Sequence, residues 1–200
     1  MARRAEYLSA AAALISAIGE ERCALAGGLA VWAHGYVRGT RDVDVVAGVG
    51  LAEAKRLLAL RGIGAALRRG DALEGGFPCL KGKIGGVPFD VLPELVAVPW
   101  DRVIALVVSG RRLRVLGLET LLEFKLKAGG AKDLMDVAML VRLHPEQEER
   151  ARHLSMAYRV KDDLARWLSD RRVAAEARAI AAEERRAATH GRRPRRAGRQ

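Results

Sequence analysis

Three aspartates stand in short segments that alternate polar and apolar residues, as half-buried strands do. Asp42 and Asp44 are separated by one valine, and Asp90 lies between two apolar residues. Residues i and i+2 of a strand point to the same face, roughly 7 Å apart, so Asp42 and Asp44 share a face. Neighbouring carboxylates repel each other unless a cation compensates. We therefore predict a magnesium or manganese site at Asp42 and Asp44, with Asp90 as the third ligand.

A pair of glycines, Gly27 and Gly28, follows the apolar run at residues 23–26. That order predicts a buried strand entering a tight turn, with a short helix over residues 29–36. Glycine has no Cβ, so its backbone N–H can approach a phosphate closely, and a helix N-terminus favours the same anion. Metal ions beside a phosphate-binding turn are the apparatus of nucleotidyl transfer from a nucleoside triphosphate (NTP) to a hydroxyl group.

Each of these features also has a simpler interpretation. Most glycine pairs are ordinary turns, most Asp-x-Asp patterns are solvated strand faces, and an acid in a hairpin such as Asp90 is more often exposed than catalytic. Their order and spacing in one segment favour the functional interpretation of the set.

Hydrophobic periodicity predicts the elements that position these residues. Strands are expected at 23–26, 42–46, 79–84, 87–92, 103–108 and 112–116, the last two as sheet strands or a β-finger. Helices are expected at 8–18, 29–36, 51–60, 119–127 and 132–143, and a charged, Ala-rich helical bundle at 146–188. Gly85-Gly86 is the two-residue turn of a hairpin, and residues 68–77 form a loop. The pattern is that of an α/β protein.

Length and composition narrow the class of protein. Two hundred residues suit one domain with an appendage. The net charge is +11, yet residues 185–200 hold seven arginines and no acid, so the other 184 residues, with 28 basic and 24 acidic side chains, carry only +4. Two cysteines exclude a disulfide scaffold and a zinc cluster. No apolar run is long enough to cross a bilayer, and the first helix is amphipathic rather than a signal peptide. We expect a cytoplasmic protein without a membrane partner.

Two motifs between residues 23 and 143 carry a resemblance to a known family. The first is Gly27-Gly28-Leu29-Ala30, His34-Gly35, Arg38, Thr40 and Asp42-Val43-Asp44; the second is Lys125-Leu126-Lys127-Ala128 with Lys132-Asp133-Leu134-Met135-Asp136. Together they resemble the nucleotidyltransferase superfamily, and within it the AbiEii-like branch of abortive-infection toxins. Gly130-Ala131 stand where relatives often carry an arginine, and this departure from the family pattern implies that this chain lacks one phosphate contact.

The resemblance implies a small mixed β-sheet nucleotidyltransferase core (residues 1–116), a C-terminal helical region that completes the active site (117–188) and an Arg-rich tail (189–200). It implies Asp42, Asp44 and Asp90 as catalytic metal ligands, with Asp90 on the strand next to the other two. It also implies a nucleotide-binding set, which comprises Gly27, Gly28, Thr40, Lys125 and Lys132. Arg38 and Thr40 are expected to position the loop before Asp42, and His34 to be a packing residue. Lys125 alone has a simpler interpretation as a lysine that snorkels from a helix face. Asp133 and Asp136 share a helix face and either hold a lysine or form a solvated rim.

Three functions stay open at this point. The first is NTP-dependent modification of an RNA acceptor, as the toxin of a toxin–antitoxin or phage-defence system with an antitoxin protein as partner. The second is modification of a small hydroxylated molecule such as an antibiotic. The third is a catalytically inactive binding module, against which the intact pair of repelling acids argues. Three roles also stay open for the Arg-rich tail: a solvated segment without a function, an arm that binds RNA without sequence preference, or a segment that docks a partner protein.

Overall fold

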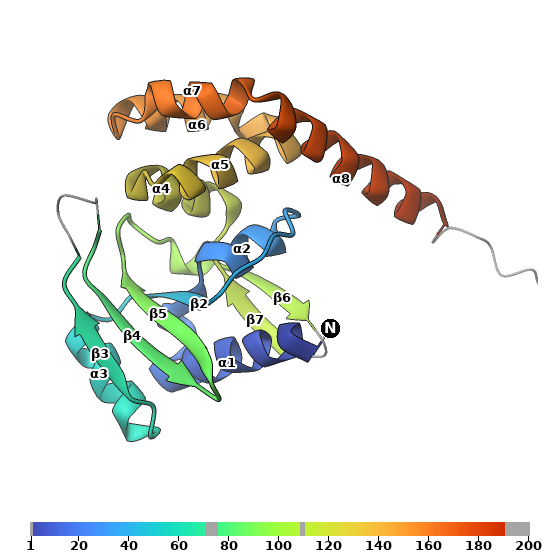
Figure 1. Ribbon diagram of the computed structural model, residues 1–200. Helices are drawn as coiled ribbons and strands as arrows, with labels where there is room; N and C mark the ends of the chain where they lie inside the picture. The colour runs from blue at the N-terminus through green and yellow to red at the C-terminus, as the bar shows by residue number, and fades with distance from the viewer. Residues whose placement is uncertain (1, 71–75, 109–110, 191–200) are drawn as a thin grey trace, which may run out of the picture.

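The computed structural model describes residues 2–70, 76–108 and 111–190 (Figure 1). The strands are β1 (Cys23–Leu25), β2 (Val43–Ala47), β3 (Ala65–Arg68), β4 (Cys79–Ile84), β5 (Val87–Pro93), β6 (Ile104–Val108) and β7 (Arg111–Val115). The α-helices are α1 (Ala2–Ile18), α2 (Gly27–Ala33), α3 (Leu51–Leu60), α4 (Leu118–Ala128), α5 (Ala131–Leu143), α6 (Glu148–Ala157), α7 (Lys161–Ser169) and α8 (Arg171–His190). Short 3-10 turns lie at Glu20–Arg22, Trp100–Arg102 and Pro145–Gln147.

The seven strands form one mixed sheet in the order β3-β4-β5-β2-β1-β7-β6. The central pair β2 and β5 is parallel, as is β1 with β7, and the other neighbours are antiparallel. The expected α/β class and mixed sheet are confirmed. Because β2 and β5 run in the same direction side by side, residues at equal register on the two strands are presented together on one face.

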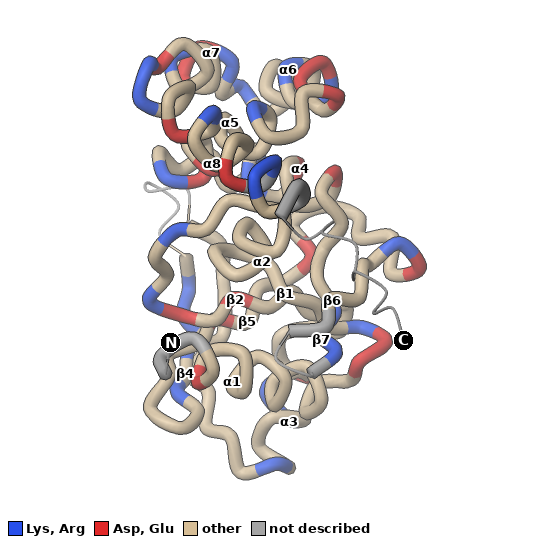
Figure 2. Tube along the Cα trace, turned by 90° about the vertical axis from the view of Figure 1, so that its right-hand side faces the viewer, with Lys and Arg blue, Asp and Glu red and all other residues tan. Residues whose placement is uncertain are grey.

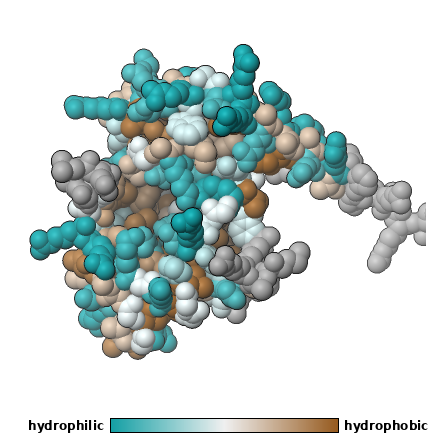
Figure 3. All heavy atoms as spheres, in the orientation of Figure 1, coloured by the Kyte–Doolittle hydropathy of each residue, from teal (hydrophilic) through white to brown (hydrophobic). Residues whose placement is uncertain are grey.

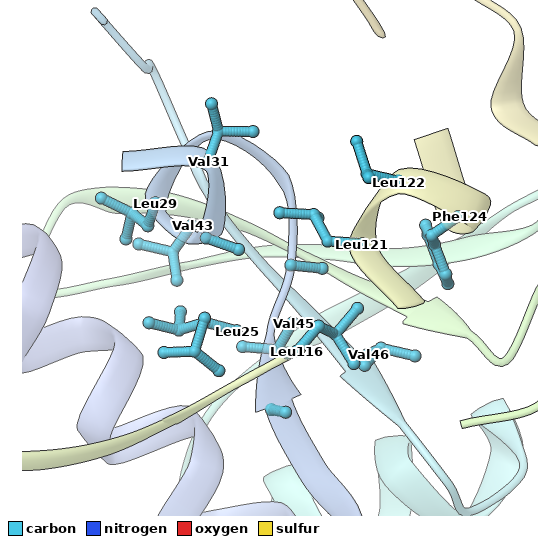
Figure 4. Packing of buried hydrophobic residues seen from close by; sticks show 14 of the residues in the cluster. Leu25, Leu29, Val31, Val43, Val45, Val46, Leu116, Leu121, Leu122 and Phe124 are labelled. Carbon is cyan, nitrogen blue, oxygen red and sulfur yellow. The ribbon is translucent and has the colours of Figure 1, made fainter. Parts of the chain in front are cut away.

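An aliphatic core joins the sheet to the helices on both sides. Helices α1 and α3 pack along one side of the sheet, whereas α2 and the helical layer α4 to α7 lie on the other (Figure 1). Figure 4 shows core side chains contributed by β1, β2, α2 and α4. Leu25, Val45 and Leu121 in this cluster are at most 2% exposed. The low aromatic content, 4% of the chain, explains why leucine and valine fill this core.

The Gly85-Gly86 hairpin is confirmed. Both glycines have positive φ, +57° and +82°, which is the geometry of the turn type that matches the twist of two antiparallel strands. The turn fixes the register, with Ile84 opposite Val87. Phe89 and Val91 are then buried at 1% and 0% exposure. Side chains alternate along β5, so the residue between them faces the opposite side of the sheet.

Several predicted boundaries differ from the structure. Helix α1 begins at Ala2 rather than residue 8, and α2 covers Gly27–Ala33 rather than 29–36, ending before Gly35, whose φ is +99°. Strand β3 was not predicted. It is a four-residue edge strand with three exposed residues, and such a segment has no hydrophobic alternation to mark it. Residues 71–75 of the predicted loop and residues 191–200 of the predicted tail lie outside the described residues.

The C-terminal part is helical, as expected. Helix α5 packs against α4, α7 and α8, and α8 then runs outward from the helical layer (Figure 1). Figure 2 shows acidic and basic residues interspersed over α6 and α7. Among the helices that the structure describes, none combines the length and the apolar character needed to cross a membrane. Both cysteines are buried and free.

Candidate active site

The three predicted aspartates converge on one face of the sheet. Asp44 and Asp90 lie directly opposite each other on the parallel strands β2 and β5, and Asp42 immediately precedes β2. One ligand oxygen from each carboxyl group lies within 4.8 Å of the other two. Each residue keeps partial exposure, so a cation can reach all three. Three carboxylates at this spacing form a hard-oxygen donor set of the kind that magnesium and manganese prefer, so the residues present fit a divalent ion.

The surroundings of Asp44 oppose its ionisation. Burial, followed by repulsion from Asp42 and Asp90, raises its pKa from 3.8 to about 7. Lys125 and a hydrogen bond from the Gly28 N–H act in the opposite direction. A carboxyl group that is only half ionised near neutral pH is poised to exchange its proton for a metal ion.

The two glycines make room for the protein's own side chains. Gly27 has a φ of +51°, and a Cβ built there would lie 1.7 Å from Asp44 Oδ2. A Cβ on Gly28 would lie 2.7 Å from Thr40 Oγ1. The turn therefore lets Asp44 approach the backbone at the start of α2, and Gly28 donates to that carboxylate. The sequence pattern predicted a close approach at these glycines; the structure shows that protein side chains make one, and the predicted contact with a phosphate stays a prediction.

Thr40 and Arg38 hold the segment that leads to Asp42. The Thr40 hydroxyl donates to the carboxylate Oδ1 of Asp42, at 3.1 Å, and lies 3.2 Å from the Asp42 carbonyl oxygen. The Arg38 guanidinium makes a two-pronged contact with the Asp136 carboxylate, with Nε and Nη2 at 2.5 and 2.6 Å. The sequence predicted a positioning role for Arg38 but not this partner, which is 98 residues away.

Lys125 is part of the same buried network. Its ammonium lies 2.7 Å from Asp133 Oδ1 and 2.8 Å from Asp136 Oδ2. Although burial alone lowers the pKa of Lys125, the two carboxylates more than offset this and hold it above its ordinary value. Lys125 is only 3% exposed, so it is a buried ion-pair partner rather than a snorkelling lysine. Lys132, predicted beside it in the nucleotide-binding set, is exposed on α5 and does not line the cleft described below.

A cleft of about 490 Å³ opens over Asp44 and Asp90, two of the three carboxylates. Asp44, Asp90, Gly27, Lys125 and Asp133 line it from β2, β5, α2, α4 and α5. Figure 3 shows apolar atoms in the recess between the helical layer and the sheet. The apolar part of the lining comprises Phe77, Leu92, Leu95, Phe124 and Ala128. A recess that combines apolar walls with a few charged groups suits a nucleotide, which carries a flat base and a charged phosphate chain.

Three basic residues at the cleft were missed from the sequence. Arg68 and Arg69 line it from the end of β3, and Lys81 lines it from β4. The Lys81 ammonium lies 2.5 Å from Asp90 Oδ2, and this hydrogen bond raises the pKa of Lys81. The hairpin turn contained the signal for this pair, because a two-residue turn at Gly85-Gly86 sets Lys81 directly opposite Asp90.

His34 is a packing residue, as expected. Its Nε2 lies 2.8 Å from the Leu116 carbonyl oxygen, and its own carbonyl oxygen accepts from the His144 ring at 2.9 Å. Burial lowers the pKa of His34, which keeps the ring neutral at physiological pH. These two bonds tie the end of α2 to the segment before α4 and to the end of α5, and so help fix the cleft walls.

No protein-family model matches the chain, and no curated protein matches its sequence. Solved structures match it in shape. The crystal structure of ANT(2'')-Ia in complex with adenylyl-2''-tobramycin is 16% identical with a TM-score of 0.49, over 73% of this chain and 92% of that one. An antigenic nucleotidyltransferase-like protein from Paracoccidioides brasiliensis is 18% identical with a TM-score of 0.39, over 73% and 83%. JHP933 from Helicobacter pylori is 14% identical with a TM-score of 0.35, over 93% and 97%. These are partial likenesses of shape and say nothing about the reaction.

Proposed function

We propose that this chain is a divalent-metal-dependent nucleotidyltransferase, which transfers a nucleoside monophosphate from an NTP to a hydroxyl acceptor. The observation that carries the proposal is the convergence of three carboxyl groups, with one oxygen of each within 4.8 Å of the others, two of which line a cleft of about 490 Å³. Asp42, Asp44 and Asp90 would hold magnesium or manganese. Bound there, the ions would activate the acceptor hydroxyl and stabilise negative charge on the triphosphate.

Side chains of the protein would accept the proton of the acceptor hydroxyl and attract the triphosphate. The acceptor oxygen attacks the α-phosphorus, the bond from that phosphorus to the bridging oxygen breaks, and pyrophosphate leaves. Asp90 receives the hydroxyl proton, because its side chain is 16% exposed toward the cleft and can meet an incoming acceptor. Lys125 is held in the cleft wall by Asp133 and Asp136, where its charge attracts the triphosphate.

The finer proposal is an RNA acceptor, with the chain as the toxin of a toxin–antitoxin or phage-defence system and an antitoxin protein as partner. Two observations support it. The two motifs that resemble the AbiEii-like branch are in direct contact through Arg38 and Asp136. The exposed Arg68 and Arg69 give one wall of the cleft a positive charge that suits a phosphate backbone.

A transfer assay tests both levels of this proposal. Each of the four NTPs, labelled on the α-phosphate, is incubated with the protein, magnesium and either cellular RNA or an aminoglycoside. We expect label in RNA, dependent on metal and lost in Asp44→Asn. The matched control is Asp101→Asn, which alters an exposed acid on a 3-10 turn and should keep full activity.

The outcomes separate the two levels. Label in the aminoglycoside alone would keep the nucleotidyltransferase activity and reject the RNA acceptor. Equal incorporation by the wild type and Asp44→Asn would contradict the assignment of the carboxylates.

A further inference from the structure

Lys81 stands in direct contact with one of the three carboxylates. It lies opposite Asp90 in the β4–β5 hairpin, and its ammonium is 2.5 Å from Asp90 Oδ2. The ammonium takes up one of the lone pairs of Asp90 Oδ2, so this carboxylate has fewer positions left for a metal ion. An ammonium at this distance also repels a divalent cation placed among the three acids. Lys81 and a metal ion therefore compete for Asp90.

Lys81 differs from the other cleft lysine in how firmly it is held. The side chain of Lys125 is 4% exposed and is fixed by two acids. The side chain of Lys81 is 52% exposed, and Asp90 is its one ion-pair partner among the described residues. A long, half-exposed side chain can leave one partner for another at little cost. Lys125 is thus a fixed charge, and Lys81 is a movable one.

The cleft supplies a second anion for Lys81 once a nucleotide is bound. Lys81 lines the same cleft as Gly27, Asp44 and Lys125. A triphosphate bound in this cleft with a metal ion at the three acids would bring negative charge close to the Lys81 ammonium, which contacts Asp90. The lysine then gains a charge-assisted hydrogen bond to phosphate in place of the one to Asp90.

We propose that Lys81 is a displaceable counter-ion, which pairs with Asp90 in the metal-free protein and moves to the triphosphate when metal and nucleotide bind together. This inference rests on the proposed function. It makes binding of metal alone weak and binding of the metal–nucleotide complex strong, so the site is loaded by the complex rather than by the free ion. Lys81 is a positioning residue for Asp90 in the first state and a phosphate-binding residue in the second.

The test measures the affinity of manganese in two conditions. Calorimetry or electron paramagnetic resonance gives the binding of Mn²⁺ alone, and then of Mn²⁺ with a nonhydrolysable NTP analogue. For Lys81→Met we expect metal alone to bind roughly two- to five-fold more tightly, because a partly exposed ion-pair competitor is gone. We expect the metal–nucleotide complex to bind about ten-fold more weakly, because a charged hydrogen bond to phosphate is lost.

Two further variants sharpen the result. Lys83→Met removes the same charge from the same face of β4, two residues away and opposite Pro88, and should change neither affinity by more than about two-fold. Lys81→Arg keeps a cation beside Asp90 and should restore weak binding of metal alone. Both lysines are exposed, so we expect these variants to fold as the wild type does.

The outcomes decide between the explanations. Opposite changes in the two affinities support the proposal. A Lys81→Met protein that binds metal alone no more tightly than the wild type overturns it, and so does one in which the complex binds as tightly as before. A wild-type protein that binds no Mn²⁺ even with nucleotide overturns the proposed function itself, and with it this inference.

Discussion

Replacing Asp44 by asparagine should stabilise the metal-free protein. Burial and the two neighbouring acids raise the pKa of Asp44 from 3.8 to about 7. A group whose pKa is higher in the folded state favours folding most at low pH, below 3.8, and this contribution is lost as pH rises to about 7. Above pH 7 Asp44 is ionised, and the folded state then bears the full free-energy cost of a buried carboxylate beside two other acids. Asparagine has nearly the same shape, can still accept from the Gly28 N–H, and carries no charge.

The size of the effect follows from the pKa shift. Each pKa unit corresponds to about 1.4 kcal/mol, so a shift of about three units corresponds to about 4 kcal/mol. Asp44 keeps partial exposure to the cleft, and solvent screens part of this energy. We therefore expect Asp44→Asn to raise the free energy of unfolding by about 2 to 4 kcal/mol at pH 8.

Urea unfolding in the presence of a chelator, from pH 3.5 to pH 8.5, measures this difference. The gain in stability should be near zero at the acid end, grow between pH 4 and pH 7, and level off above. Asp101→Asn, the exposed control, should show a small difference that does not vary with pH. Saturating magnesium should stabilise the wild type more than Asp44→Asn, because only the wild type has all three carboxylate ligands. The difference in free energy of unfolding between the two proteins should therefore decrease. A variant less stable than the wild type at pH 8 without metal, or a gain that does not depend on pH, would refute the reasoning.

Three further substitutions test separate parts of the site. Gly27→Ala places a Cβ 1.7 Å from Asp44 Oδ2, at a φ of +51°, and should lower both thermal stability and Mn²⁺ affinity. Gly64→Ala, which has open space around it, is the control and should lower neither. Asp136 is fully buried and pairs with both Arg38 and Lys125, so Asp136→Asn should lower the free energy of unfolding in urea by about 3 kcal/mol. Asp163→Asn, which alters an exposed acid, is the control and should lower it by about 0.5 kcal/mol or less. Asp90→Asn should abolish nucleotide transfer yet leave NTP binding within a few-fold of the wild type by calorimetry; loss of binding to the same extent would show that Asp90 has no separate role in the chemical step.

The faces that the three carboxylates occupy were predictable because local patterns determine them, whereas the neighbouring position of their two strands was implied by the family resemblance. The Asp42-Val43-Asp44 alternation assigns both acids to one face. A two-residue glycine turn fixes the register of the hairpin, which decides the face that Asp90 occupies. Phe89 and Val91 are buried as this register requires.

Apart from the Lys81 and Asp90 pair, which the hairpin turn determines, much of the site depends on contacts that no local pattern encodes. The Arg38 and Asp136 pair joins residues 98 positions apart, and its geometry follows from how α5 packs over the sheet. Arg68 and Arg69 line the cleft from the end of β3, an edge strand without the hydrophobic alternation that would have predicted it. Lys132 belongs to a sequence motif, but its position on the helix turns it to solvent, away from the cleft lining.

Anomalous scattering from crystals soaked with Mn²⁺ and a nonhydrolysable NTP analogue tests the central claim most directly. We predict manganese among Asp42, Asp44 and Asp90, with their carboxylate oxygens in direct contact with the metal and the triphosphate bound in the adjoining cleft. Manganese bound elsewhere, or a nucleotide seated in the cleft with none of the three carboxylates near a metal ion, would contradict it.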